Sequence, residues 1–216
     1  MAKQSNAREL LEKKADKDRI FSAVLDDPKS IADLIEILHE KKGTLRYSSE
    51  KILRAISETD PDLIYPYFET FADLLDAENS FLKWGAIIII SNLVGVDEDR
   101  RFDSISNRYF APMQGPVLVT AANIVSNAWK IAMARPDLSD MIVSRLLSVE
   151  NAEFINKGSP SNECNNIIRG KAIESFANFY DDIRDKDSVI AFVERQLDNS
   201  RNAVTKKAEK FLRKYA

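Results

Sequence analysis

The feature that most constrains the fold of this chain is a helical pattern that recurs along it. Each of five segments begins with an apolar residue and a second residue that is often basic, and a small residue follows three positions later. The five segments begin at residues 45, 82, 118, 168 and 204, so the intervals are 37, 36, 50 and 36 residues. The small residues are Ser49, Ala86, Ala122, Ala172 and Ala208. A small side chain at a fixed position lets a helix approach its neighbour closely, so the pattern predicts stacked helical units.

The rest of the chain also has helical rather than strand periodicity. In residues 31–38 the apolar residues are Ile31, Leu34, Ile35 and Leu38, which is the spacing of one helix face. The four isoleucines at 87–90 are also interpreted as helix, because the apolar segment around them is long for a strand and contains no turn signal. With only six Gly and seven Pro among 216 residues, an all-β fold lacks material for its turns.

Glycine and proline mark the boundaries between the predicted helices. Four prolines stand where a new apolar period begins, which is typical of the first turn of a helix. They are Pro28, Pro61, Pro116 and Pro136. Gly85 and Gly170 are different, because they lie in the same helical turn as the small residues and would allow still closer helix packing.

Two parts of the chain lie outside the regular pattern, and each has its own prediction. The 50-residue interval places an insertion near 150–163, which we expect to be a surface loop, either neutral or a binding element. Its candidate binding residues are Asn156, Lys157, Ser159 and Ser161. Residues 1–27 are predicted to form N-terminal capping helices, because the end of a helical stack otherwise leaves an apolar face in water. Residues 28–216 then form the stack itself, within a single domain overall.

Three of the five segments open with an apolar–basic pair, and prolines stand at two of the helix starts. These residues are Leu45-Arg46, Leu82-Lys83, Ile168-Arg169, Pro61 and Pro136. With the small residues, they resemble the HEAT-repeat (HEAT-like, armadillo-type) helical repeat family over roughly residues 28–216. The resemblance implies an all-α fold, a right-handed α-α superhelix (solenoid) of about five helix pairs. Val119 and Thr205 depart from the pattern where the family often has a basic residue.

The resemblance also implies that the second helix of each pair lines a concave binding face. The candidate residues on that face are Tyr47, Lys51, Arg54, Trp84, Ser91, Asn123, Asn127, Lys130, Glu174 and Asn178. Trp84 and Trp129 are the natural anchors for a bound peptide, although a tryptophan in an apolar helix is also a common core residue.

The chain offers little material for catalysis. Cys164 is the only thiol and His39 the only imidazole, and the resemblance places them about three repeats apart, too far for a nucleophile–base pair. We expect Cys164 to be a buried small residue at a helix start and His39 to be a surface residue near a helix end. The sequence has no glycine-rich phosphate loop. We therefore predict no catalytic residue, no metal and no cofactor.

Charge is unevenly distributed along the sequence. Residues 55–82 contain seven acids and no Lys or Arg, whereas residues 201–216 contain six basic residues and one acid. Segments of opposite charge could pair head to tail in a homo-oligomer, or each could be a solvated helix face. The net charge of −3 and the pI near 5.4 argue against a dedicated nucleic-acid binder.

Two functional hypotheses follow. The first is a non-catalytic scaffold or adaptor that binds a protein partner. The alternative is a nucleic-acid-binding protein related to the DNA alkylation-repair glycosylases built on HEAT-like repeats. We expect a cytoplasmic protein with no membrane segment, because the most apolar stretch, 81–96, is 16 residues long and a membrane-spanning helix needs about 20.

Overall fold

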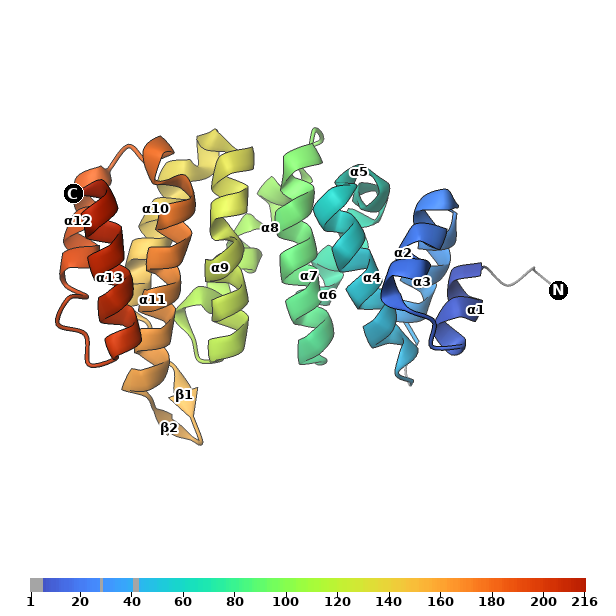
Figure 1. Ribbon diagram of the computed structural model, residues 1–216, viewed down its shortest axis with the longest axis horizontal. Helices are drawn as coiled ribbons and strands as arrows, with labels where there is room; N and C mark the ends of the chain where they lie inside the picture. Colours follow the sequence, from blue (N-terminus) through green and yellow to red (C-terminus); the bar gives the residue numbers. More distant parts are fainter. Residues whose placement is uncertain (1–5, 28, 41–42) are drawn as a thin grey trace. The chain divides into compact units, whose positions relative to one another are not determined.

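A computed structural model describes residues 6–27, 29–40 and 43–216 of the chain. It consists of two compact units, residues 1–102 and 103–216, which are described in turn. Both units are built from helices, and the strands in the described residues form a single two-stranded hairpin (Figure 1). None of the helices within the described residues has the length and apolar character needed to span a membrane.

The first unit opens with two short helices and continues as alternating short and long helices. Its elements are α1 (Asn6–Glu12), α2 (Lys17–Asp26), α3 (Ser30–Leu38), α4 (Leu45–Thr59), α5 (Pro61–Ile64), the 3-10 turn η1 (Tyr65–Tyr67), α6 (Phe68–Leu74), α7 (Ser80–Leu93) and η2 (Val94–Val96). Helix α4 packs against α3 on one side and against α7 on the other. Helices α1 and α2 pack on α3 and α4, and their role as a cap stays a prediction.

The second unit continues the same alternation. Its elements are α8 (Arg101–Phe110), which begins at the unit boundary, η3 (Ala111–Gln114), α9 (Leu118–Ala134), η4 (Pro136–Leu138), α10 (Ser139–Ser148), η5 (Val149–Asn151), β1 (Ile155–Asn156), β2 (Ser159–Pro160), α11 (Asn162–Phe179), η6 (Tyr180–Asp182), α12 (Lys186–Glu194) and α13 (Asn202–Tyr215). Helix α11 packs between α9 and α13, so the long second helices lie side by side (Figure 1). This all-α arrangement of helix pairs confirms the predicted fold class.

The helix boundaries follow from side chains in the sequence. The side chains of Asn79 and Ser161 accept hydrogen bonds from backbone N–H groups three residues later, at 3.2 and 3.3 Å, and so start α7 and α11. Pro61 is the first residue of α5, and Pro136 is the first residue of η4. Pro116 departs from the prediction because it lies two residues before α9, and Pro28 lies outside the described residues.

The small residues of the repeat pattern are buried between helices, with one correction. Ser49, Ala86, Ala172 and Ala208 are at most 1% exposed. Ala122 is only half-buried, and Ala121 takes its place at 0%. Helix α9 is therefore in register one position earlier than the sequence alignment suggested, because its buried face runs through Ala121, Val125 and Ala128. The pair aligned at its start, Leu118-Val119, was therefore also placed one residue too late.

Gly85 and Gly170 lie where an added side chain would meet the neighbouring helix, which agrees with the predicted close packing. A methyl group on Gly85 would overlap the side chain of Glu50 on α4. A methyl group on Gly170 would lie 3.1 Å from Cγ2 of Val204 on α13. Both glycines therefore shorten the distance between second helices within their own unit.

The insertion near 150–163 is a β-hairpin rather than a simple loop. Strands β1 and β2 pair antiparallel, with Asn156 opposite Ser159. Lys157 and Gly158 form the two-residue turn, and their φ values of 51° and 82° are typical of hairpin turns. Phe154 is fully buried just before the hairpin, and Ser161 caps α11 just after it. The sequence prediction missed the hairpin because strands of two residues have no detectable periodicity.

A glycine of the second unit gives the first testable prediction. Gly115 has φ 109°, and a methyl group there would overlap the backbone oxygen of Glu153. The positive φ and the steric overlap both make a side chain at this position unfavourable. Gly115→Ala should therefore lower the free energy of unfolding by about 2–3 kcal/mol. Urea denaturation followed by circular dichroism measures the change.

The matched control for this substitution is Gly95→Ala. Gly95 has no neighbouring atom within 4 Å of the added methyl group and no positive φ. We expect Gly95→Ala to be neutral or to stabilise by up to about 1 kcal/mol. Equal losses in the two variants would contradict the assigned contact between Gly115 and Glu153.

Candidate functional site

The ten predicted concave-face residues divide between the two units. Helices α4 and α7 of the first unit hold Tyr47, Lys51, Arg54, Trp84 and Ser91. Helices α9 and α11 of the second unit hold Asn123, Asn127, Lys130, Glu174 and Asn178. That they share one binding face stays a prediction, and each unit is therefore considered by itself.

Ser91 is a correction to the predicted set. Its side chain is buried, at 2% exposure, and its hydroxyl donates a hydrogen bond to the carbonyl oxygen of Ile88 at 2.6 Å. A serine can enter an apolar helix interface in this way because its own helix satisfies the hydroxyl. Ser91 is therefore a packing residue and not part of an exposed face.

The three predicted asparagines use their side-chain amides on their own helices. Asn123, Asn127 and Asn178 each donate to the carbonyl oxygen four residues earlier, at 2.8–2.9 Å. Asn178 is exposed, whereas Asn123 and Asn127 are half-buried. These bonds hold the side chains close to the helix surface.

An aromatic cluster of Tyr47, Phe81 and Trp84 is the most distinctive surface of the first unit. Phe81 is 66% exposed, the highest value among the large apolar side chains in the described residues. Its ring packs edge to face against Tyr47, at a centroid distance of 5.9 Å, and against Trp84, at 5.4 Å. Aromatic pairs at such distances stabilise each other's orientation, so the exposed ring is held in place.

Polar neighbours fix the Tyr47 end of the aromatic cluster. The hydroxyl oxygen of Tyr47 accepts hydrogen bonds from the Asn79 amide at 3.0 Å and from the Arg46 guanidinium at 2.9 Å. These two donors lower the pKa of Tyr47 below its ordinary value, with the Asn79 bond contributing most. Asn79 also caps α7, so one residue positions both the helix that carries Phe81 and the tyrosine beside it.

The predicted residue Arg54 forms a partly buried ion pair with Glu50 on α4, the helix that also carries Lys51. The Arg54 guanidinium contacts the Glu50 carboxylate at 2.9 Å, and Glu50 is only 8% exposed because it packs against Gly85. Burial raises the pKa of the Glu50 carboxyl, although Arg54 acts in the opposite direction. Lys51, by contrast, lines a pocket of about 360 Å³ beside α1 and α2, together with Lys14 and Lys17.

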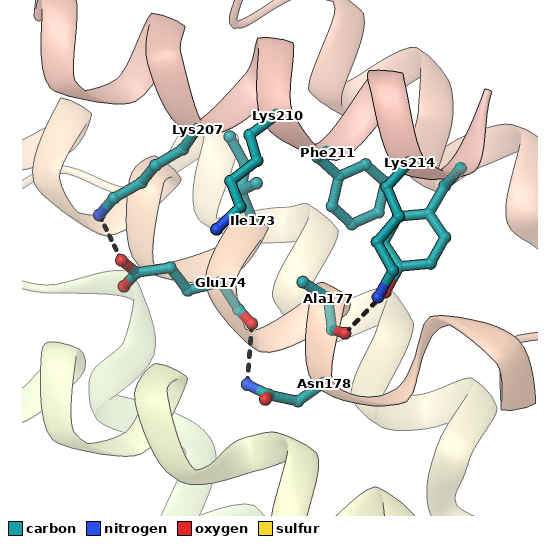
Figure 2. A pocket seen from close by; sticks show the side chains of 9 residues that line it. Ile173, Glu174, Ala177, Asn178, Lys207, Lys210, Phe211 and Lys214 are labelled. Carbon is teal, nitrogen blue, oxygen red and sulfur yellow. Dashed lines mark hydrogen bonds and ion pairs between the residues drawn. The ribbon is translucent and has the colours of Figure 1, made fainter.

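The second unit contains a groove of about 370 Å³ between α11 and α13, here called the α11–α13 groove (Figure 2). It is lined by Ile173, Glu174, Ala177, Asn178, Lys207, Lys210, Phe211, Lys214 and Tyr215. The buried side chains of Ile173 and Phe211 make its floor apolar. The predicted residues Glu174 and Asn178 therefore lie together at one wall, whereas the lysines of α13 form the other.

The amphipathic pattern of α13 places its lysines on the groove. Val204, Ala208 and Phe211 form its buried face and pack toward the rest of the unit. Lys207, Lys210 and Lys214 have the i, i+3, i+7 spacing of a neighbouring helical face. The helix is anchored near its start by Val204 against Gly170 and near its end by the Tyr215 hydroxyl, which donates to the Ala177 carbonyl at 3.0 Å.

Ion pairs neutralise only part of the positive charge of the α11–α13 groove. The Glu174 carboxylate contacts Nζ of Lys207 at 2.7 Å and Nζ of Lys171 at 3.2 Å. Burial acts to raise the pKa of Glu174, but the two lysines outweigh it, so the pKa is lowered. Nζ of Lys214 donates to the uncharged hydroxyl of Tyr215 at 2.7 Å, and this bond raises the pKa of Lys214.

The remaining predictions concern the residues that could take part in catalysis or bind a metal, and the acidic segment. Cys164 is buried in the first turn of α11, and His39 is exposed at the end of α3, so both positions agree with the sequence analysis. Within residues 6–27, 29–40 and 43–216, no three His, Cys, Asp or Glu side chains come together as a possible metal site. Of the seven acids in 55–82, all but Asp60 are exposed, which agrees with a solvated face.

Two residue sets that define these surfaces were not predicted from the sequence. Phe81 was taken as part of an apolar helix, yet Phe81, Trp84 and Ile88 follow an i, i+3, i+7 stripe outside the buried face. The lysines of α13 were noted only as a basic segment. In both cases the helical spacing was present in the sequence, but the position of the neighbouring helix was needed to interpret it.

Comparisons with known proteins establish the armadillo/HEAT-like helical repeat fold. A designed armadillo repeat protein in complex with the peptide (KR)4 is similar with a TM-score of 0.55 and 13% identity, over 97% of this chain and 91% of that one. An engineered protein is similar with a TM-score of 0.53 and 14% identity, over 99% and 92% of the two chains. A second designed armadillo repeat protein has a TM-score of 0.50 and 14% identity, over 96% and 90%. No family model and no curated protein matches the sequence.

The buried Glu50 gives a prediction for pH dependence. Its pKa is raised above the ordinary 4.5 in the folded protein, so the unfolded chain binds fewer protons between the two values. The stability that Glu50 contributes is therefore present at low pH and is lost as pH rises through the folded pKa. Glu50→Gln removes this titration, so the wild type should lose stability relative to the variant as the pH rises above 4.5, the ordinary value of the carboxyl pKa.

Urea denaturation at several pH values measures this difference. Glu58→Gln on the same helix is the control, because Glu58 is exposed and its change removes the same formal charge. A stability difference between wild type and Glu50→Gln that stays constant as the pH rises would contradict the prediction.

Proposed function

We propose that the protein is a non-catalytic scaffold or adaptor that binds a segment of a protein partner. The observation that carries the proposal is the aromatic cluster, in which Phe81 is exposed and yet held by Tyr47 and Trp84. Exposed aromatic side chains that are already ordered lose little entropy on binding and are frequent anchors of protein interfaces. The fold supports the proposal, because a similar designed armadillo repeat protein binds a peptide.

The chemistry of the aromatic cluster favours apolar or cationic side chains in the partner. Aromatic faces attract Lys and Arg through cation–π interactions, and they bury apolar side chains equally well. Exposed Asp76 and Glu78 lie directly before the helix that carries Phe81, and they would attract a basic segment. The (KR)4 peptide of the designed protein has this chemistry. We extend the proposal to a cytoplasmic location, because a chain with one cysteine suits a reducing compartment.

A displayed library of random peptides, selected on the purified protein, tests the proposal. Selected peptides should bind the wild type, and Phe81→Ala should weaken them at least about tenfold, or about 1.4 kcal/mol, since a central aromatic anchor is lost. Fluorescence anisotropy with the labelled peptides measures the dissociation constants. Because Phe81 is mostly exposed, the variant should keep its fold, which circular dichroism verifies.

Met133→Ala is the matched control for this experiment. Met133 is also a large apolar side chain at 48% exposure, but it lies on α9, outside the aromatic cluster. Peptide affinity should be unchanged in Met133→Ala. A library that yields no binding peptide, or equal losses in the two variants, would exclude the proposed function of the aromatic cluster.

A further inference from the structure

The α11–α13 groove has an excess of positive charge that its own residues do not balance. Glu174 is shared by Lys207 and Lys171, whereas Lys214 donates to a neutral tyrosine and Lys210 projects from α13 toward α11 (Figure 2). Two acids are relevant to this balance. With the Tyr215 hydrogen bond, the charge of Asp181 raises the pKa of Lys214. Glu209 is the sole acidic residue of α13. The groove therefore has the charge to attract an anionic partner.

The floor of the groove shows that a simple anion would not fill it. Ile173 and Phe211 are buried beneath the lysines, and the volume of about 370 Å³ is within the range of sites that hold organic groups. A group that fits must combine negative charge with an apolar part. A peptide segment with acidic residues and one apolar side chain has both.

The shape of the groove favours such a peptide over a nucleic acid. Single-stranded nucleic acids bind by stacking bases on exposed aromatic rings. Of the two aromatic rings that line the groove, Phe211 is only 3% exposed, and the half-buried ring of Tyr215 already packs against Tyr180, Phe211 and Nζ of Lys214. The protein as a whole has a net charge of −3, which opposes binding to a polyanion. A short acidic peptide brings a few carboxylates to the lysines, whereas a nucleic acid also carries the negative charge of the phosphates that lie outside the groove.

We propose that the α11–α13 groove binds an acidic segment of a protein partner, whose carboxylates contact Lys210 and Lys214 and whose apolar side chain lies over the exposed Ala177, above the buried Ile173 and Phe211. This site is independent of the aromatic cluster, which is in the other unit and favours the opposite charge. The two proposals can therefore fail separately.

The spacing of the lysines defines the sequence of the bound segment. Lys210 and Lys214 are four residues apart on a helix, which is a rise of about 6 Å. In an extended peptide, side chains two residues apart point to the same side at a separation of about 6–7 Å. The expected motif therefore has acidic residues at two alternate positions and an apolar residue at the next alternate position.

A labelled nonapeptide, Gly-Ser-Phe-Ser-Asp-Ser-Asp-Ser-Gly, is the probe for this site. Fluorescence anisotropy at low ionic strength should show saturable binding that weakens as salt increases. Replacing both Asp residues of the probe by Asn should weaken binding about fivefold or more, because two charged contacts are lost, and replacing Phe by Ser should also weaken it. A probe that does not bind, or that binds equally well without its Asp residues or without its Phe, overturns the proposal.

Two double variants with the same charge change separate the groove from the helix as a whole. Lys210→Gln with Lys214→Gln should weaken binding about fivefold or more, since two charged contacts are lost. Lys206→Gln with Arg213→Gln removes two exposed basic residues of α13 that do not line the groove, and it should leave affinity nearly unchanged. Equal losses of affinity in the two double variants would mean that the probe responds to the total charge of α13 and not to the groove, and would overturn the proposal.

Two controls and two competing occupants complete the test. Circular dichroism must show both double variants folded, and Phe81→Ala must bind the probe as the wild type does. A labelled DNA or RNA oligonucleotide that binds more tightly than the probe, and loses affinity in the Lys210/Lys214 variant, would overturn the peptide proposal in favour of a nucleic acid. Sedimentation equilibrium that shows a dimer lost in the same variant would assign the groove to a second copy of this chain.

Discussion

Close contact between neighbouring second helices is the constraint on which the rest of the structure depends. Ser49, Ala86, Ala172 and Ala208 leave no side-chain bulk where these helices meet their neighbours, and Gly85 removes even the methyl group opposite Glu50. Each long helix can then bury one face on its own pair and another on the next helix. The faces that remain carry the exposed side chains, among them Phe81 on α7 and Lys210 on α13.

The repeat architecture could be predicted from sequence because it depends on local periodicity. Helical spacing, the small residues and the prolines at 61 and 136 are all visible without knowing which helix contacts which. The one-residue error at Ala122 shows the limit of this approach, since Ala121 and Ala122 are equally small and only their neighbours distinguish them. The hairpin at 155–160 was missed for a related reason, because two-residue strands depend on the turn at Lys157 and Gly158 rather than on a pattern.

The candidate sites could be predicted only in part. Tyr47, Trp84, Glu174 and Asn178 were found because they lie on second helices, and they do line the two surfaces described here. Phe81, Lys210 and Lys214 were not found, because an apolar or basic residue has no functional signature until its surroundings are known. Ser91 was wrongly included for the same reason, since a polar residue can be satisfied inside a core by its own helix.

The hairpin between α10 and α11 is a place where the chain can change in length without a shift in the register of α11. Phe154 is buried before it and Ser161 caps α11 after it, so both ends of the insertion are fixed while its turn is exposed. Residues added at Lys157 or Gly158 would lengthen the chain without moving Ala172 away from its packing position on α11. The second unit thus has a position where a foreign peptide or a label can be inserted without changing how its helices pack.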